Sequence, residues 1–302
     1  MDTLDYAILR QFMHPGTFQW DVRISNRDVA EAVGVDEETV RQRIRRLSER
    51  GILVRWSIAL HPALLGRRMY RLELPALTGP ARARAFDGLA AMGNVYHLFD
   101  FYGGRLALVV YAEEGAAFER QLALVGALWA PPTSVAEMRL PPPTVEPTVT
   151  DWKVLRALRE DARAPYATIA EHAGLSERTV RRSVERLIEG RAMWLSPIAE
   201  MERAEGTIPT AIRIFYADPA MRAAVDGRLK ALDGIIFATH YPDQTQLSYG
   251  ARRLAEAEEL REELARMPGV ARVEVDIMIR RVTVDGWMDE IIARRIKEST
   301  DG

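Results

Sequence analysis

The sequence contains no cysteine, which excludes several kinds of chemistry at once. Disulfide bonds, thiolate nucleophiles and cysteine-ligated metal sites all need that residue. The five histidines are far apart along the chain, and no two of them have the short spacing of a metal-binding motif. We therefore expect neither a metal ion nor another cofactor.

Long hydrophobic runs are also missing, because no stretch approaches the ~18 apolar residues of a membrane-spanning helix. The N-terminus is acidic and polar, unlike a signal peptide, which has a basic segment before an apolar run. The sequence predicts a cytoplasmic protein without membrane contact. Its formal net charge is only −2, so any nucleic-acid-binding face must gather positive charge locally.

The sequence also lacks recognisable catalytic motifs. We find no nucleophile beside a base, no glycine-rich phosphate loop and no metal motif. We therefore expect that the protein is not an enzyme.

The most informative feature of the sequence is an internal repeat. Residues 30–47 (AEAVGVDEETVRQRIRRL) match residues 170–187 (AEHAGLSERTVRRSVERL) at a constant offset of 140. Residues 4–10 match residues 150–156 at an offset of 146, because the first copy holds extra residues around 14–20. Such self-similarity indicates a tandem duplication.

Each repeat begins with the pattern of a helix-turn-helix. Gly34 and Gly174 are placed to end a short helix, because glycine adopts the left-handed conformation that follows a helix without steric penalty. Asp36 and Ser176 are placed to cap the next helix. Capping boxes are predicted at 25–28 and 168–171 for the preceding helix. Strands beginning near residues 51 and 190 would start the wing.

The second helix of each repeat presents charge on its outward face. With Val40 and Val180 at the buried centre, helical periodicity places four residues of each copy outward. These candidate DNA-binding residues are Glu38, Arg41, Gln42 and Arg45 in the first copy and Arg178, Arg181, Arg182 and Glu185 in the second. Arginine and glutamine are the side chains that read guanine and adenine in the major groove.

About 80 residues of another character follow each helix-turn-helix. Strand-like and helix-like runs alternate in the order β-α-β-β-α-β, which is typical of a ferredoxin-like domain. The runs are 70–77, 81–92, 95–101, 106–112, 116–128 and 134–140 in the first copy, and 211–217, 221–232, 235–241, 246–251, 255–267 and 270–282 in the second.

The fold class predicted from these patterns is α+β, with two winged helix-turn-helix domains alternating with two ferredoxin-like domains. The expected segments are winged helix-turn-helix 1 (1–62), ferredoxin-like domain 1 (63–140), a Pro-rich linker (141–150), winged helix-turn-helix 2 (151–205), ferredoxin-like domain 2 (206–285) and a C-terminal helix (286–302). An extended linker of this length spans ~30 Å, which allows the two ferredoxin-like sheets to pack together as an intramolecular pseudo-dimer. Further association of whole chains stays open.

The second repeat resembles the N-terminal domain of Lrp/AsnC-type transcriptional regulators. The resemblance rests on residues 151–165, 169–170, 174–176, 179–180 and 186–187. The ferredoxin-like segment resembles the effector-sensing domain of that family, and the Met-Pro-Gly-Val turn at 267–270 resembles the turn before its last strand. The whole chain is similar to a fused two-copy form of that family. The resemblance implies a regulator that binds double-stranded DNA, associates through its ferredoxin-like domains and responds to an amino acid or a similar small effector.

An effector of that kind would bind where the ferredoxin-like domains meet, near the turns between their middle strands. Asp100, Gly103 and Asp243 are the candidate ligand-binding residues there. The two carboxylates would suit an amine, although aspartate is also an ordinary turn residue.

Two other functions are compatible with the sequence. Haem-pathway decarboxylases resemble this family's fold, and His97 and His240 lie in the second strand of each ferredoxin-like domain. Alternatively, the helix-turn-helix units serve protein interaction only, since the acidic residues 36–38 would repel phosphate.

Overall fold

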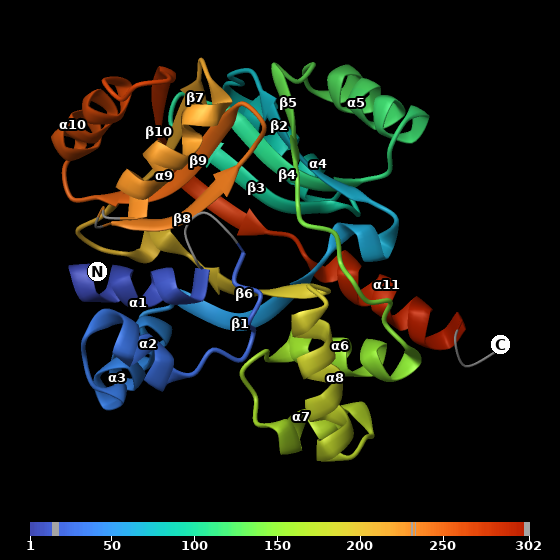
Figure 1. Ribbon diagram of the computed structural model, residues 1–302. Helices are drawn as coiled ribbons and strands as arrows, with labels where there is room; N and C mark the ends of the chain where they lie inside the picture. Colours follow the sequence, from blue (N-terminus) through green and yellow to red (C-terminus); the bar gives the residue numbers. More distant parts are fainter. Residues whose placement is uncertain (14–17, 231, 233, 299–302) are drawn as a thin grey trace.

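The computed structural model describes residues 1–13, 18–230, 232 and 234–298 of the chain. Each repeat starts with three helices and a strand, which we call the first head and the second head (Figure 1). The first head consists of α1 (Thr3–Met13), α2 (Asn26–Val33), α3 (Glu37–Glu49) and β1 (Leu53–Leu60), and the second head of α6 (Val149–Glu160), α7 (Tyr166–Ala173), α8 (Glu177–Glu189) and β6 (Met193–Ala199).

Each head is followed by the β-α-β-β-α-β order that the sequence predicts, so the α+β fold class is confirmed. The first set is β2 (Arg68–Leu74), α4 (Gly79–Ala90), β3 (Val95–Phe101), β4 (Leu106–Ala112), α5 (Ala116–Leu128) and β5 (Ser134–Met138). The second set is β7 (Ile208–Tyr216), α9 (Arg222–Lys230), β8 (Ile235–His240), β9 (Gln244–Ala251), α10 (Leu254–Ala265) and β10 (Val270–Thr283), and α11 (Gly286–Glu298) follows it.

The turn inside each helix-turn-helix has the predicted geometry. Gly34 and Gly174 follow α2 and α7 with φ values of 72° and 65°, a left-handed conformation that favours glycine. Asp36 and Ser176 then cap α3 and α8 by accepting hydrogen bonds from backbone amides.

The two predicted capping boxes have different outcomes. The box that begins at Ser25 is present at the start of α2. The box that was predicted to begin at Thr168 is wrong, because α7 already begins at Tyr166 after Pro165. Proline suits a helix start because it lacks the amide that the first turn leaves unpaired.

The wing strands pair with each other rather than within their own heads. Strand β1 runs antiparallel to β6, with Ser57 opposite Ser196, and the pair forms a two-stranded sheet between the heads. The duplicated chain thereby supplies both partners of a pairing that an isolated wing strand would lack.

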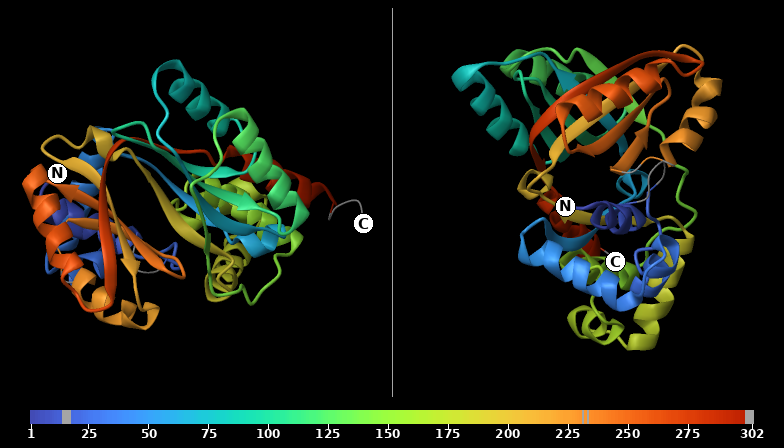
Figure 2. Two further views of the ribbon diagram at one scale, coloured as in Figure 1. Left: turned by 90° about the horizontal axis from the view of Figure 1, so that it is seen from above. Right: turned by 90° about the vertical axis from the view of Figure 1, so that its left-hand side faces the viewer.

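The two ferredoxin-like sets form one eight-stranded sheet with the order β5-β2-β4-β3-β10-β7-β9-β8. Residues 270–277 of β10 pair with β7, and residues 278–283 pair with β3, so this single strand joins the halves. Helices α4, α5, α9 and α10 cover the outer face (Figure 2). The concave inner face faces the heads, and Arg213 of β7 reaches across it to Glu73 of β2 at 3.8 Å.

The two ends of this sheet differ between the copies. Strand β10 has 14 residues and continues onto β3, whereas its counterpart β5 has only 5 and stops at Met138. Pro141 to Pro143 follow β5 closely, and proline cannot donate a backbone hydrogen bond to a neighbouring strand. The edges of β5 and β8 therefore stay unpaired in the sheet, and we call the space between them the open seam.

Helix α6 begins at Val149, inside the segment 141–150 that is predicted as a linker, because Thr148 and Asp151 form a capping box. Helix α11 packs against α6, and its predicted apolar side, with Trp287, Ile291 and Ile292, is buried. Residues 299–302 of the predicted C-terminal helix lie outside the described residues. In the part of the chain that the structure describes, no helix is long and apolar enough to cross a membrane.

Candidate functional site: two exposed helices and a central cavity

All eight residues that were predicted to face outward are exposed. They lie on α3 and α8, on the side away from the buried Val40 and Val180. The structure therefore presents two helical faces of similar geometry, one on each head.

The exposed face of α3 is neutralised by its own carboxylates. Arg41 pairs with Glu37 at 2.9 Å and also with Glu38. The Gln42 amide donates a hydrogen bond of 3.1 Å to Glu38. The groups that would contact a ligand are thus tied to neighbours on the same helix.

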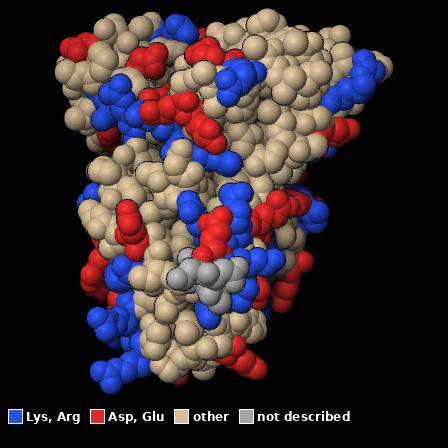
Figure 3. Space-filling view, turned by 90° about the vertical axis from the view of Figure 1, so that its right-hand side faces the viewer, with Lys and Arg blue, Asp and Glu red and all other residues tan. Residues whose placement is uncertain are grey.

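The exposed face of α8 keeps its positive charge. Arg181 lies 3.4 Å from Glu177 and stacks on the Tyr166 ring, 4.3 Å from its centroid. Among the described residues, neither Arg178 nor Arg182 has an ion-pair partner. Lys and Arg side chains gather along one side of the lower end of the molecule, where the second head lies (Figure 3).

A buried carboxylate holds each exposed helix in place. Asp5 of α1 lies 2.9 Å from Arg46 of α3, and its side chain is 1% exposed. Asp151 of α6 accepts a hydrogen bond of 2.5 Å from Ser183 of α8 and pairs with Arg186. The first helix of each head thereby fixes the helix that carries the outward residues.

Reciprocal arginines clasp the two heads together. Arg23 of the first head donates to the carbonyl oxygens of Ala162 and Ala164 at 3.0 and 2.8 Å. Arg163 of the second head donates to the carbonyl oxygen of Ile24 at 2.6 Å. These arginines are 140 residues apart, so they occupy equivalent positions in the repeat and relate the heads by a pseudo-two-fold axis.

A central cavity lies between the concave face of the sheet and the two heads, where α1 and β6 contribute to its wall. It has a volume of about 70 Å³ and adjoins a groove of about 500 Å³ along the open seam. Phe18, Met138, Thr239 and Tyr241 line both spaces. Small-molecule sites typically measure roughly 300–1,000 Å³, so the two spaces together have the size of a ligand site.

The cavity contains positive charge without a carboxylate. Arg71 and Arg281 line it, and no Asp or Glu belongs to its described lining. Buried charges are normally paired or hydrogen-bonded, because desolvation disfavours an isolated ion. The lining is therefore suited to an anion.

His97 lies in the same cavity, and its Nδ1 is 3.2 Å from the Thr283 hydroxyl. Burial holds the pKa of the imidazole well below its usual value, and the positive charges of Arg281 and Arg71 lower it further. The ring is therefore neutral at pH 7.

The predicted ligand residues lie outside this cavity and its groove. Asp100 is buried and pairs with Arg82 at 2.6 Å, so its charge is already compensated. Gly103 has a φ of 86° in the turn between β3 and β4, and Asp243 is exposed in the turn between β8 and β9. Their role in binding an amine remains a prediction.

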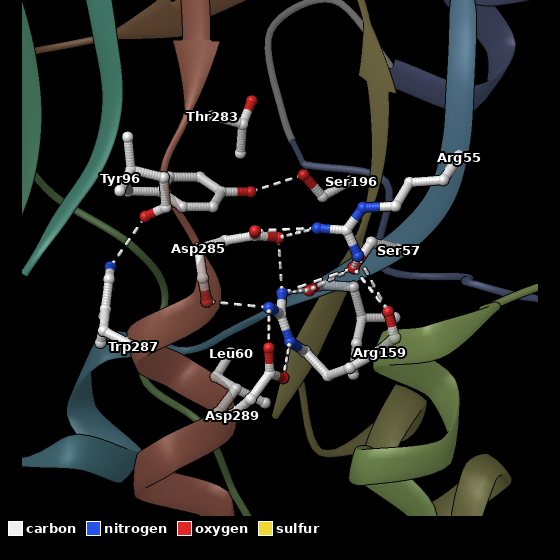
Figure 4. A network of polar contacts seen from close by, with 12 residues as sticks. Arg55, Ser57, Leu60, Tyr96, Arg159, Ser196, Thr283, Asp285, Trp287 and Asp289 are labelled. Atoms are coloured by element: carbon white, nitrogen blue, oxygen red, sulfur yellow. Dashed lines mark hydrogen bonds and ion pairs between the residues drawn. The ribbon is translucent and has the colours of Figure 1, made fainter. Parts of the chain in front are cut away.

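A buried polar network connects the sheet to both heads (Figure 4). Asp285, just after β10, accepts hydrogen bonds of 2.8 Å from Arg55 of β1 and from Arg159 of α6. Asp289 of α11 also binds Arg159, and nearby the Tyr96 hydroxyl lies 2.5 Å from that of Ser196. The end of β10 is thus fastened to the first and the second head.

Residues 1–48 and 148–188 match the AsnC-type helix-turn-helix domain. The chain therefore contains an AsnC-type helix-turn-helix domain in each head. Its helix-turn-helix domain is present twice, and the matched segments contain α1 to α3 and α6 to α8 of the two heads.

Solved structures of other proteins are similar to this chain to different degrees. Siroheme decarboxylase NirDL is 13% identical and covers 98% of this chain and 99% of that chain, with a TM-score of 0.59. Its co-complex with an iron-uroporphyrin III analogue gives the same identity and coverage and a TM-score of 0.58. E. coli AsnC is 18% identical and covers 45% of this chain and 93% of that chain, with a TM-score of 0.35. No curated protein matches the chain in sequence.

The expectation that the chain is not an enzyme is contradicted, because a solved structure that matches its fold over 98% of the chain is that of an enzyme. The expectation relied on the lack of a contiguous catalytic motif. A fold can host different functions, and site residues need not be neighbours in sequence. Arg71, His97 and Arg281 line one cavity, yet they come from three different strands, β2, β3 and β10.

Sequence reasoning missed this cavity, although two signals pointed to it. Arg71 and Glu73 are charged and buried, and they lie two residues apart, on the same side of β2. The extra residues of the first copy, around 14–20, contribute Phe18 to the cavity wall. Residues 14–17 of that insertion lie outside the described residues.

Proposed function

We propose that this chain is a transcriptional regulator that binds double-stranded DNA with both heads and recognises an asymmetric operator. The observation that carries the proposal is the pair of AsnC-type helix-turn-helix domains whose exposed helices, α3 and α8, differ in charge. In helix-turn-helix proteins the second helix lies in the major groove, and its early residues contact base edges.

The outward residues of the two heads favour different bases. Glu38 corresponds to Arg178, Gln42 to Arg182 and Arg45 to Glu185, whereas Arg41 corresponds to Arg181. Arginine pairs with guanine, glutamine with adenine and a carboxylate with cytosine. The half-site under the second head should therefore be richer in guanine.

The clasp between the heads supports simultaneous binding. Because Arg23 and Arg163 hold each head to the backbone of the other, α3 and α8 keep a fixed spacing. A fixed spacing favours one separation of the half-sites on the DNA.

Selection of bound sequences from a random DNA library tests the proposal with the full chain. We expect a consensus of two unlike half-sites. Arg182→Ala should lower affinity by ~1–3 kcal/mol and relax the preference at one base position. Arg266→Ala, at an exposed arginine on the far side of the sheet, is the control and should leave the consensus unchanged. A perfectly symmetric consensus would contradict the proposal.

A second candidate function is the removal of a carboxylate from a tetrapyrrole, as in siroheme decarboxylase NirDL. The observation that favours it is a cavity with two arginines and a neutral imidazole on a fold that matches that enzyme throughout. The arginines would hold a carboxylate, and His97 would lie beside it.

Anaerobic incubation of the purified chain with sirohaem tests this candidate. Mass spectrometry should show stepwise loss of CO2 with the wild-type chain and no loss with His97→Ala. His172→Ala, at an exposed histidine of α7, is the matched control. Unchanged sirohaem after incubation with the wild-type chain would rule the candidate out.

A further inference from the structure

We propose that the central cavity binds an organic carboxylate with a flat apolar body, held by Arg71 and Arg281, and that the ligand enters along the open seam. The proposal concerns a binding site. Its connection to DNA binding rests on the function proposed above.

Arg71 is the first observation that points to a ligand. Its side chain is 3% exposed, and its Nε donates to Glu73 at 2.7 Å. Its Nη2 is buried and has no hydrogen-bond partner among the described residues. A buried, charged donor without a partner is costly, and a carboxylate in the cavity would satisfy it.

Arg281 supplies the second guanidinium group. Its Nη2 donates to the carbonyl oxygen of Ala199 at 3.3 Å, and no ion pair of Arg281 occurs within the described ranges. Burial lowers the pKa of this arginine, although the group stays charged at neutral pH. Glu73 already compensates part of the charge of Arg71, whereas Arg281 has no such partner, so the excess charge is centred on Arg281.

Several aromatic side chains also line the cavity and suit a flat ligand body. The Phe18 ring lies 4.4 Å from the Trp194 ring and 6.1 Å from the Phe237 ring, measured between centroids. Phe99 lines the same space beside Arg71. Aromatic side chains offer large apolar surfaces that stack favourably on other rings.

The open seam provides the way in and sets the size of the ligand. The inner cavity of about 70 Å³ accommodates little more than the acidic end of a ligand, and the groove of about 500 Å³ accommodates the body. Arg139 and Arg222 line the groove, so a second acidic group at the outer end of the ligand would also meet positive charge. The site therefore favours a dicarboxylate or polycarboxylate over a zwitterionic amino acid.

The position of Arg281 connects the ligand to the heads. Its bond to Ala199 reaches the end of β6 in the second head. It lies four residues before Asp285, which binds Arg55 of the first head and Arg159 of the second (Figure 4). A ligand that moves β10 would therefore shift the contacts of both heads.

Isothermal titration calorimetry of the full chain tests the site with three probes. They are naphthalene-2,6-dicarboxylate, its uncharged diamide, and metal-free uroporphyrin III as a larger polycarboxylate. We expect at least one carboxylate probe to bind with one-to-one stoichiometry and the diamide not to bind. Arg281→Met should lower the affinity for the carboxylate probe by about tenfold or more, because this variant loses a charge-assisted hydrogen bond to the ligand.

Matched variants separate the site from general effects of charge. Arg280→Met removes the neighbouring arginine, which stacks on Phe86 on the other side of the sheet, and should leave affinity unchanged. Thr239→Phe narrows the passage between cavity and groove and should abolish binding. Arg281 is preferred to Arg71 because loss of Arg71 would also leave the buried Glu73 without its nearest partner.

Three results would overturn the proposal: no binding of either carboxylate, equal binding of the diamide, or an unchanged affinity in Arg281→Met. DNA affinity is then measured with and without the probe that binds, and a change of about threefold or more is expected. If the probe binds but the chain binds no DNA, the site stands and the proposed function fails. If DNA binds but no carboxylate does, the site fails and the proposed function stands.

Discussion

The two heads are built alike where they are buried and differ where they are exposed. Both have a glycine turn, a capped second helix and a buried aspartate, Asp5 or Asp151, that holds the helix in place. Their outward faces differ, because α3 pairs its arginine with its own glutamates whereas α8 leaves Arg178 and Arg182 without carboxylate partners. The residues that hold each helix in place and the residues that face outward are therefore at separate positions.

The difference between the two outward faces shows what two heads in one chain gain over a dimer of identical chains. In an identical dimer every substitution occurs twice, so both heads must stay equal. In one chain, each copy changes independently while the shared support is kept. The following experiments challenge or refine this comparison.

The largest effect is expected on DNA binding. Replacing Arg178 and Arg182 together by Gln should weaken binding by ~2–4 kcal/mol, because each contact with a base or phosphate contributes ~1–3 kcal/mol. Replacing the two outward arginines of the first head, Arg41 and Arg45, by Gln should cost less than half of that, since Glu37, Glu38 and Glu49 already neutralise them. Fluorescence anisotropy over a salt series measures both. Equal losses would mean that the charge difference between α3 and α8 has no consequence.

Substitution of the buried aspartate that holds the exposed helix should destabilise both heads to a similar extent. Asp5→Asn and Asp151→Asn each remove a buried carboxylate that holds arginine, and we expect a loss of ~2–3 kcal/mol of unfolding free energy. This lies below the usual range for a buried pair because Arg46 and Arg186 are partly exposed. Urea denaturation gives the values, with the exposed Glu171→Gln as a control within ~0.5 kcal/mol. A large effect in one copy alone would show that the supports are not equivalent.

A pH dependence of stability is expected from His61, which lies in the first copy. Burial lowers the pKa of His61 to about 4, and its Nδ1 accepts a hydrogen bond from the Ala63 amide, which requires the neutral ring. The unfolded chain has the ordinary value near 6.5, so it binds more protons than the folded chain between these two values. Stability is therefore complete above about pH 6.5 and falls as the pH drops toward 4.

The matched variant is His61→Met, because Met201 occupies the equivalent position of the second copy. Between pH 7 and pH 5 the wild-type chain should lose ~1–2 kcal/mol more unfolding free energy than His61→Met. Urea denaturation at both pH values measures the difference, and parallel pH profiles would refute the assignment.

The smallest effect concerns one backbone position. Arg191 has a φ of 53°, and Gly51 with a φ of 66° occupies the equivalent place in the first copy. Left-handed backbone disfavours residues that carry a Cβ atom. Arg191→Gly should raise the unfolding free energy by ~0.5–1 kcal/mol, whereas Gly51→Ala should lower it, since the added Cβ would lie 2.8 Å from Arg203. Differential scanning calorimetry would show opposite shifts of the melting temperature, and shifts of the same sign would contradict this reading.

Local signals made most of the fold predictable. Gly34, Gly174 and the caps at Asp36 and Ser176 act on neighbouring residues, so their pattern indicates the helices and turns directly. The exposure of the outward residues followed from helical periodicity in the same way. The order of strands and helices along the chain was predictable because turns bound each strand-like run.

Contacts over long sequence distances were not predictable from those patterns. The apolar alternation of β10 shows that it is a strand, yet not that its second half leaves β7 for β3. Arg71 and Arg281 are separated by most of the chain, and only the curvature of the sheet brings them to one cavity. No local pattern shows that β1 and β6 become partners, because that pairing depends on how the heads are clasped.

The open seam makes two opposite sides of the molecule different from each other. A two-fold symmetric dimer looks the same after half a turn, so it has no preferred direction on a symmetric DNA site. Here one side is closed by β10 and the other is open between β5 and β8. On an asymmetric operator the protein would bind in one orientation only. The open seam, and with it the ligand entrance, would then always face the same flanking region of the DNA.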